Sequence, residues 1–271
     1  MLWCSLALPV CGVDLTEAAR KAFDEYVARS EAAMNSEPGG GRVLDRVPEA
    51  RARIEEREVT AFPFADRKPN SEASVSVPDG LINHWFGATF IPNATLADLR
   101  AVMEDYANYS RIYAPDVVES KLVARHGDDF DVFLRLFRQV RVKVLLGFGF
   151  PVEFNTRYRV QYSVINGTLR IRSVSSRIAQ VKDPKQSHTD EYAPDGGDGF
   201  LWRLNSYWRA YEGTSKGVKG VILESEAISL SRSVPGFLER MVTYFTTNFP
   251  RESMEGTLRK TRDVVVARRR R

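Results

Sequence analysis

The sequence predicts an α+β fold in which a curved antiparallel β-sheet wraps around a long C-terminal helix, with an extra helix at the N-terminus. Seven strand-like runs follow one another after residue 115 with no helical pattern between them. Turn signals such as Asn166-Gly167 separate these runs. The last apolar element is long and helical. Because a curved sheet must cover its apolar face, we expect this helix to lie against it and to leave a cavity unless large side chains fill the space.

Length and composition limit the class of protein. The chain has 271 residues, of which 43% are hydrophobic and 27% are charged, which is the balance of a soluble globular protein. A chain of this size buries enough surface to fold without a metal or a disulfide. The composition excludes a collagen, a coiled coil and wholesale disorder.

The first twelve residues are apolar and uncharged and contain both cysteines, Cys4 and Cys11. This run is too short to span a bilayer. It resembles the core and cleavage region of a signal peptide, with Val10 and Gly12 at the −3 and −1 positions, but the usual positive segment in front of it is missing. The protein is therefore secreted or periplasmic if this segment is a signal peptide, and cytoplasmic otherwise. Its removal would leave no cysteine for a disulfide or a thiolate site.

A helical extension follows. Residues 15–34 carry an apolar stripe at helical spacing, and the proline and glycines of residues 38–41 end that helix. Residues 42–57 predict a second, weaker helix, residues 58–64 a strand and residues 65–78 a polar loop. The pattern of hydrophobic residues that predicts strands and helices becomes dense and regular only after this extension.

The main domain begins with a strand at residues 82–91 and a helix whose N-cap is Thr95, with Asp98 near the capping-box position. The strand-like runs then follow at residues 116–125, 130–138, 141–148, 153–164, 168–181, 200–211 and 218–231. A helix that opens at Pro235 and, after a break at residues 248–250, a last helix complete the domain.

These boundaries divide the chain into a possible signal peptide remnant (1–12), a helical extension and linker (13–74), the main domain (75–266) and a basic tail (267–271). Lys and Arg number 39 and Asp and Glu number 35, so the formal net charge of +4 equals the charge of the four arginines Arg268–Arg271. The remainder is formally neutral and shows no basic face. This argues against a nucleic-acid partner and leaves at most weak membrane contact through the tail.

A family resemblance is carried by five segments: Pro78–Trp85, Gly199–Arg209, Glu224–Arg232, Phe249–Ser253 and Thr257–Arg262. They resemble bacterial members of the START-like, helix-grip superfamily (SRPBCC). The resemblance implies a helix-grip fold that encloses a hydrophobic cavity, which relatives use for lipids, sterols, plant hormones and polyketides. A minority of relatives are cyclases, dehydratases or hydroxylases. No catalytic motif of this branch can be carried over residue by residue.

The hairpin of residues 200–231 has two contrasting faces. A turn at residues 212–217 predicts one face that pairs large with small side chains: Trp202 with Ala227, Leu204 with Ser225, Ser206 with Leu223 and Trp208 with Val221. The other face pairs Arg203 with Glu226 and Asn205 with Glu224, beside Tyr207 and Arg209. This mixed face is either a solvent-facing ladder of ion pairs or a polar part of the cavity wall. Its apolar members favour the cavity, since a solvated ladder does not need them.

Catalytic motifs are few. No HExxH, paired CxxC, GxSxG or P-loop pattern occurs, and we expect no metal and no cofactor. Only His84 of the three histidines is placed to face the cavity, and a lone histidine in a strand is more often structural. Glu224 and Glu226 could act as acid and base, as could Glu104 or Asp105 on the helix.

We therefore expect a protein that binds, transports or sequesters a hydrophobic small molecule or lipid between the sheet and the C-terminal helix, and that is more a binding protein than an enzyme. The expected ligand-binding residues are Trp85, Phe133, Tyr158, Arg203, Asn205, Tyr207, Arg209, Glu224 and Glu226. One alternative is a polyketide cyclase- or dehydratase-like enzyme that uses a cavity carboxylate or His84, which requires a cavity group with a displaced pKa. A second is an interaction module with a filled core. The ligand and the oligomeric state stay open.

Overall fold

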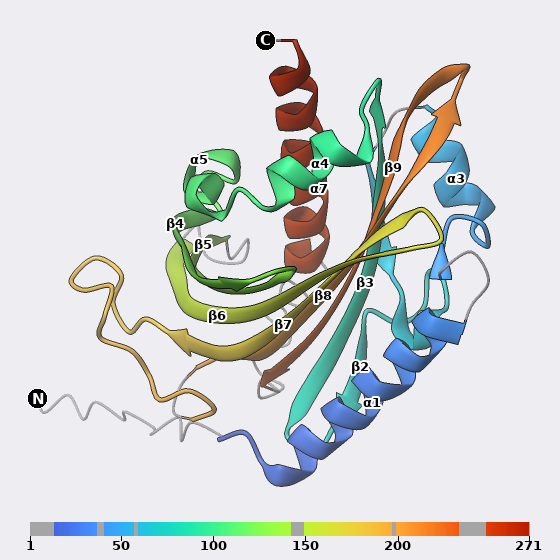
Figure 1. The fold of residues 1–271 in the computed structure, drawn as a ribbon. Helices are drawn as coiled ribbons and strands as arrows, with labels where there is room; N and C mark the ends of the chain where they lie inside the picture. The colour runs from blue at the N-terminus through green and yellow to red at the C-terminus, as the bar shows by residue number, and fades with distance from the viewer. Residues whose placement is uncertain are drawn as a thin grey trace, which may run out of the picture.

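The computed structural model describes residues 14–36, 41–56, 59–141, 149–196, 199–232 and 248–270. Within them, nine antiparallel strands form one sheet in the order β1-β3-β9-β8-β7-β6-β5-β4, with β2 also paired to β3 (Figure 1). The strands are β1 (Thr60–Pro63), β2 (Ser74–Val77), β3 (Gly80–Pro92), β4 (Val117–His126), β5 (Asp129–Arg141), β6 (Gly149–Ile165), β7 (Thr168–Gln180), β8 (Leu201–Ser215) and β9 (Val218–Arg232). The helices are α1 (Glu17–Ser36), α3 (Pro48–Glu55), α4 (Leu96–Met103), α5 (Tyr109–Ile112) and α7 (Phe249–Arg269), with single turns at η1 (Ala65–Arg67) and η2 (Tyr106–Asn108).

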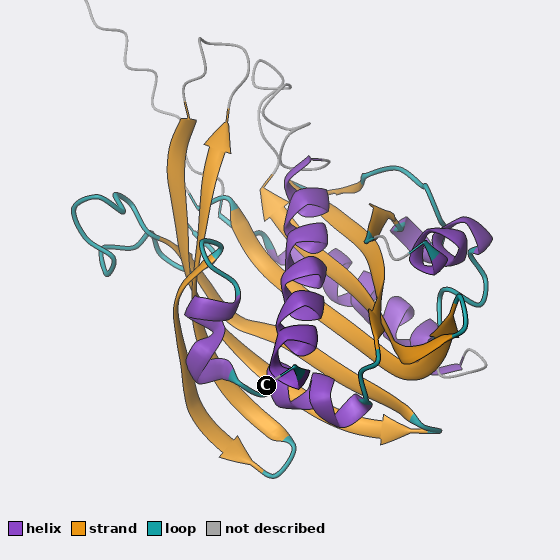
Figure 2. Ribbon diagram, turned by 90° about the horizontal axis from the view of Figure 1, so that it is seen from above, coloured by secondary structure: helices purple, strands orange, loops and turns teal. Residues whose placement is uncertain are grey.

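Helix α7 lies across the concave face of the sheet (Figure 2). Its buried residues, Met254, Leu258, Thr261 and Val265, recur every three or four positions and form one stripe. Gly87 of β3 permits a close approach, because a Cβ atom there would lie 2.6 Å from the Met254 sulfur and 2.8 Å from Leu258 Cδ1. The predicted fold class is confirmed: a curved antiparallel sheet grips a long C-terminal helix.

The N-terminal extension covers the outer face of the sheet around β3, β8 and β9, where α1 lies beside β2 and α3 beside β1 and β3 (Figure 1). Even-numbered residues of β3 point to this face, since side chains alternate along a strand. Aromatic and aliphatic side chains from the extension and from the sheet are buried together there: Phe23, Tyr26, Ile54, Phe64, Ile82, Phe86, Phe90 and Trp202. The extension is therefore a packed layer of the fold.

The β8–β9 hairpin closes through a two-residue turn, Lys216–Gly217, in which both φ angles are positive. Such short turns match the twist of paired strands, and glycine adopts positive φ readily. The sequence predicted a longer turn, so the predicted register is wrong by four residues: Ser206 pairs with Ala227 and not with Leu223. Because four is an even number, the residues after the bulge at Leu201–Arg203 keep their predicted faces.

One predicted loop contains a strand in the structure, and some predicted elements lie outside the described residues. Strand β2 forms inside the predicted polar loop of residues 65–78. The possible signal segment at residues 1–12, the helix that opens at Pro235 and most of the strand-like run at 141–148 lie outside the described residues. Of the helices that the structure describes, none is long and apolar enough to cross a membrane.

The predicted basic tail is partly helical. Helix α7 continues to Arg269, and its last turn contacts the region around α4. Arg268 forms an ion pair with Asp105, and Arg269 Nη1 lies 3.2 Å from Asp98 Oδ2. Two of the four terminal arginines therefore have carboxylate partners in the fold.

Candidate functional site

A cavity of about 280 Å³ lies between the concave face of the sheet and the N-terminal part of α7. Its wall is formed by β3, by the start of β4, by β5 to β9, by the segment from α4 to α5 and by α7. Most of the side chains that line it are aliphatic or aromatic, among them Leu134, Leu136, Phe154, Val160, Ile171 and Met254. This is the kind of wall that small-molecule sites have.

The cavity forms where small side chains face the helix. Ser206 of β8 and Ser225, Ala227 and Ser229 of β9 line it from the sheet side. Helix α7 packs directly on the sheet at Gly87 through Met254 and Leu258, and Met254 also lines the cavity, together with other residues from the N-terminal part of the helix. The small side chains of β8 and β9 leave space beside this close contact.

Tyrosines form one wall of the cavity. The hydroxyls of Tyr109 and Tyr162 both donate to the carbonyl oxygen of Met103, at 2.5 and 2.7 Å, and Tyr113 is hydrogen-bonded to Thr261 Oγ1 at 3.0 Å. Burial raises the pKa of Tyr113 to about 12 and raises the pKa of Tyr109 well above its ordinary value. These tyrosines are therefore neutral near pH 7, with their polar atoms already used.

One ion pair borders the cavity. Arg138 Nη1 lies 2.6 Å from Asp116 Oδ1, and Arg138 Nη2 donates to Ser253 Oγ at 2.7 Å. Asp116 also pairs with Lys260, at 2.6 Å. No other charged side chain that the structure describes lines the cavity. The described part of the chain also holds no group of three His, Cys, Asp or Glu side chains that could bind a metal ion.

Three of the expected ligand-binding residues are aromatic and lie outside the hairpin of residues 200–231: Trp85, Phe133 and Tyr158. Trp85 and Tyr158 line the cavity, and that they bind a ligand stays a prediction. Phe133 does not, because it lies between Val132 and Leu134 of β5, which point to the concave face. Its ring lies on the other side of the strand, with cationic groups of three neighbours within 6.0 Å: Lys121, Arg135 and Arg157. Its placement at the cavity is therefore wrong.

The six expected residues of the hairpin do not line the cavity either: Arg203, Asn205, Tyr207, Arg209, Glu224 and Glu226. Leu204, Ser206 and Trp208 occupy the concave face of β8, so the alternating residues point outward. The placement of this mixed face in the cavity wall is thus wrong. A solvated ladder does not describe it, because Glu224 and Glu226 are fully buried beneath the extension. Arg203 pairs with Asp195 and not with Glu226.

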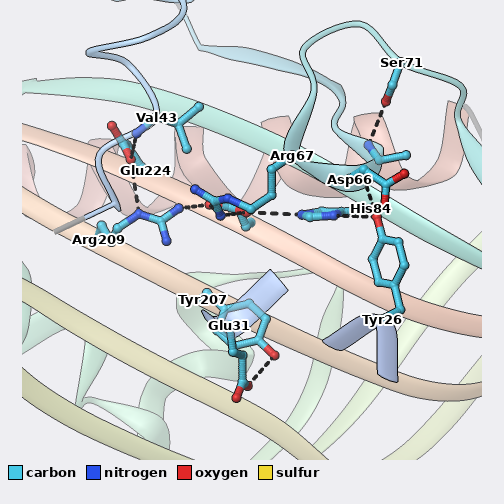
Figure 3. A network of polar contacts seen from close by, with 12 residues as sticks. Tyr26, Glu31, Val43, Asp66, Arg67, Ser71, His84, Tyr207, Arg209 and Glu224 are labelled. Carbon is cyan, nitrogen blue, oxygen red and sulfur yellow. Dashed lines mark hydrogen bonds and ion pairs between the residues drawn. The ribbon is translucent and has the colours of Figure 1, made fainter. Parts of the chain in front are cut away.

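His84 is also on the outer face, where it joins a buried polar network (Figure 3). Its Nδ1 lies 3.0 Å from the Tyr26 hydroxyl and its Nε2 lies 3.2 Å from Glu226 Oε2. Burial, together with the positive charges of Arg67 and Arg209, lowers the pKa of His84 to about 3. The expectation that His84 faces the cavity is therefore wrong.

The charges of this network balance. Glu226 is paired with Arg67 and Arg209, and Arg209 Nε also donates to Glu224 Oε2 at 3.3 Å. The Glu224 carboxylate also accepts hydrogen bonds from the extension and from β8. The backbone N–H groups of residues 43 and 44 donate to it at 3.0 and 3.1 Å, and the Tyr211 hydroxyl donates to it at 2.9 Å. Two carboxylates thus face two guanidinium groups, which is the condition under which buried charges persist.

The sequence did not predict that residues of the extension take part in this polar network, nor that serines line the cavity. Arg67 and Tyr26 come from segments predicted as a polar loop and as an amphipathic helix, and no local sequence pattern indicates their partners, which lie far away in the chain. The serines had a signal, since small polar residues alternate along β9 on the face predicted to pack against large side chains.

Comparisons with known proteins give likenesses to solved structures alone. No family model matches the chain, and no curated protein matches it. A STAR-related lipid transfer protein fragment from Xanthomonas axonopodis is 16% identical, with a TM-score of 0.44 and coverage of 72% of this chain and 99% of that one. The Zhui aromatase/cyclase from a Streptomyces species is 12% identical, with a TM-score of 0.43 and coverage of 70% and 96%. Human STARD10 is 13% identical, with a TM-score of 0.40 and coverage of 79% and 80%. These likenesses are weak, so the fold assignment rests on the topology described above.

Proposed function

We propose that this protein binds a hydrophobic small molecule in the cavity between the sheet and α7, and that it carries or sequesters this molecule. The observation that supports the proposal is the cavity itself, whose wall is mostly apolar and in which the hydroxyls of four tyrosines, Tyr106, Tyr109, Tyr113 and Tyr162, are already paired. Side chains around an empty space lack packing partners. A ligand of matching shape would supply these contacts, with Trp85 and Tyr158 among its neighbours.

The size of the cavity favours a compact ligand. Its volume of about 280 Å³ lies near the lower end of the roughly 300–1,000 Å³ of small-molecule sites. A single ring system or one short acyl chain suits this space better than a lipid with two long chains. An interaction module with a filled core is supported less, because the described side chains leave this cavity between the sheet and α7.

An enzyme is supported less than a binding protein. Among the described side chains, the charged groups that line the cavity are Asp116 and Arg138, which are paired with each other. The carboxylates that the sequence suggested as acid and base form ion pairs away from the cavity: Glu104, Asp105, Glu224 and Glu226. His84 lies on the outer face, so the geometry offers it no route to a cavity ligand.

Naphthalene binding tests the proposal. We expect the wild-type protein to bind naphthalene, measured by its fluorescence, because a bicyclic hydrocarbon suits an apolar cavity of this size. Ala227→Phe places a ring in the cavity from the sheet side and should abolish this binding. Ser163→Phe adds the same ring at an exposed position of β6 and should leave binding unchanged.

Native mass spectrometry with organic extraction of protein from its source organism is the second measurement, and it should find a bound apolar molecule. Circular dichroism must show that both variants fold. Wild-type protein that binds no naphthalene and yields no extractable molecule would overturn the proposal, as would equal binding by the Ala227→Phe variant.

A further inference from the structure

The two sides of the cavity differ in how their polar groups are satisfied. On the tyrosine side, the hydroxyl groups are paired within the protein, including Tyr106 with Tyr162 at 2.7 Å. On the sheet side, five serines line the cavity, and one of them, Ser231 of β9, is hydrogen-bonded to Asn83. The other four come from β7, β8 and β9: Ser173, Ser206, Ser225 and Ser229. None of these four hydroxyls has a hydrogen-bond partner anywhere in the part of the chain that the structure describes. Ser225 is only 2% exposed.

The strand register places these hydroxyls close together. Ser173 pairs directly with Ser206, and Ser206 pairs with Ala227. Ser225 and Ser229 lie two residues to either side of Ala227 on β9. Directly paired residues have Cβ atoms about 5 Å apart and diagonal neighbours about 7–8 Å apart. The serines thus form one patch, with Ser206 at its centre, that is about as wide as a small ring system.

Strand β3 extends this patch with two further unpaired polar atoms. Asn83 donates its side-chain amide to Ser231 Oγ at 3.3 Å, but its carbonyl oxygen Oδ1 has no partner. The indole N–H of Trp85 has no partner either. Both side chains line the cavity, and Asn83 is 4% and Trp85 2% exposed.

Unpaired buried polar groups are rare in proteins because each one costs free energy. Here two such buried groups, Asn83 Oδ1 and Trp85 Nε1, lie on the same side of the cavity as four serine hydroxyls without a partner among the described residues, which indicates that the occupant completes them. Serine hydroxyls donate and accept, Asn83 Oδ1 accepts only, and the Trp85 indole donates only. The complement must therefore offer both hydroxyl hydrogens and acceptor oxygens. No charged side chain of β3, β7, β8 or β9 that the structure describes lines the cavity, so this complement is neutral.

We propose that the ligand is a compact, neutral molecule with several hydroxyl or carbonyl oxygens along one edge, and that it binds with this edge toward the serine patch (Ser173, Ser206, Ser225 and Ser229) and its apolar face toward the tyrosines. This inference rests on the proposed function and names the ligand class of the same cavity.

A pair of probes tests the ligand class. Naphthalene and 1,3-dihydroxynaphthalene share one ring system, but the second carries two hydroxyl groups on one ring. Their affinities are measured for wild-type protein and for Ser206→Ala. We expect the substitution to weaken dihydroxynaphthalene binding about 2- to 10-fold, the range for one neutral hydrogen bond, and to leave naphthalene binding unchanged or slightly tighter. Because the same substitution is compared for both probes, the difference in hydration between naphthalene and dihydroxynaphthalene cancels.

Ser225→Ala is a second variant at the patch and should act in the same direction. Ser163→Ala removes an exposed serine of β6 and is the matched control, for which neither affinity should change. If both patch variants change the affinities for the two probes equally, the inference is overturned while the proposed function stays intact. This result is expected if water molecules alone satisfy the serine hydroxyls. Wild-type protein that binds neither probe would overturn the proposed function and this inference together.

Discussion

His84 and Glu226 are both fully buried, and 3.2 Å separate His84 Nε2 from Glu226 Oε2. The Tyr26 hydroxyl accepts a hydrogen bond from the backbone N–H of Asp66 at 2.8 Å, so its own hydrogen is available for His84 Nδ1. Nδ1 is therefore the acceptor, and Nε2 carries the hydrogen that is donated to Glu226. The imidazole is neutral, and it links helix α1 to the charged pairs of β8 and β9.

The first prediction concerns stability in mild acid. The pKa of His84 in the folded protein, about 3, lies below its ordinary value of 6.5. Between these values the unfolded chain binds more protons than the folded one, so the free energy of unfolding falls as the pH is lowered from 6.5 toward 3. One such group contributes about 1.4 kcal/mol per pH unit. Urea unfolding at several pH values between 7 and 5 measures this slope, above the range in which carboxylates titrate.

His84→Gln supplies the control for this slope, because glutamine keeps a side-chain donor and does not titrate. The variant should be less stable at pH 7, but its free energy of unfolding should depend less on pH between 6.5 and 5. A slope of the same size in the variant would contradict the assignment. An NMR titration of the wild-type protein, in which the His84 ring signals should not move above about pH 5, checks the same point without unfolding.

The elements of the fold were predictable because their signals are local. Alternation along β6 to β9, the capping box at Thr95 and the stripe along α7 each lie within one short segment. Beyond the bulge at Leu201–Arg203, the faces of β8 and β9 were also separated correctly in composition, since alternation is local too. Trp202, which lies at the bulge, was predicted on the face of Leu204 but is buried on the outer face. Which face meets the helix is not a local property. It depends on the extension, which covers the charged face and leaves the small-residue face to α7.

The errors at the site have the same origin. His84 and Trp85 were both expected at the cavity, although neighbouring residues of a strand point to opposite faces and only Trp85 lines it. Arg67 pairs with a glutamate that is 159 residues away in the chain, in a segment predicted as a polar loop. The cavity itself depends on side-chain sizes on several strands at once, so its volume could not be inferred from any one segment.

The second prediction concerns the buried charges. Glu226→Gln removes one of the two carboxylates that face Arg67 and Arg209, and it should lower the free energy of unfolding by about 3 kcal/mol or more, because an unbalanced positive charge stays buried. Glu55→Gln makes the same chemical change in the half-exposed pair with Arg51 and should have no detectable effect. Denaturant unfolding at pH 7 compares the two variants. Equally small losses in both would show that the network contributes no more than a surface ion pair.

The third prediction concerns the contact that positions α7. A valine at Gly87 would occupy space now held by the ends of the Met254 and Leu258 side chains, which lie 2.6 and 2.8 Å from the position of a Cβ atom. We expect Gly87→Val to lower the free energy of unfolding by about 1–3 kcal/mol, the range for overpacking. Ser163→Val adds the same side chain at an exposed position of β6 and should change stability little.

A double variant separates this steric effect from a loss of strand flexibility. Met254→Ala removes the sulfur that the valine would meet, so Gly87→Val should cost less in the Met254→Ala background than in the wild-type protein. Because α7 also forms one wall of the cavity, Gly87→Val should weaken naphthalene binding, and the double variant should recover part of it. If the effects of the two substitutions on stability are additive, Gly87 does not set the position of the helix, and the cavity depends on the small side chains of β8 and β9 alone.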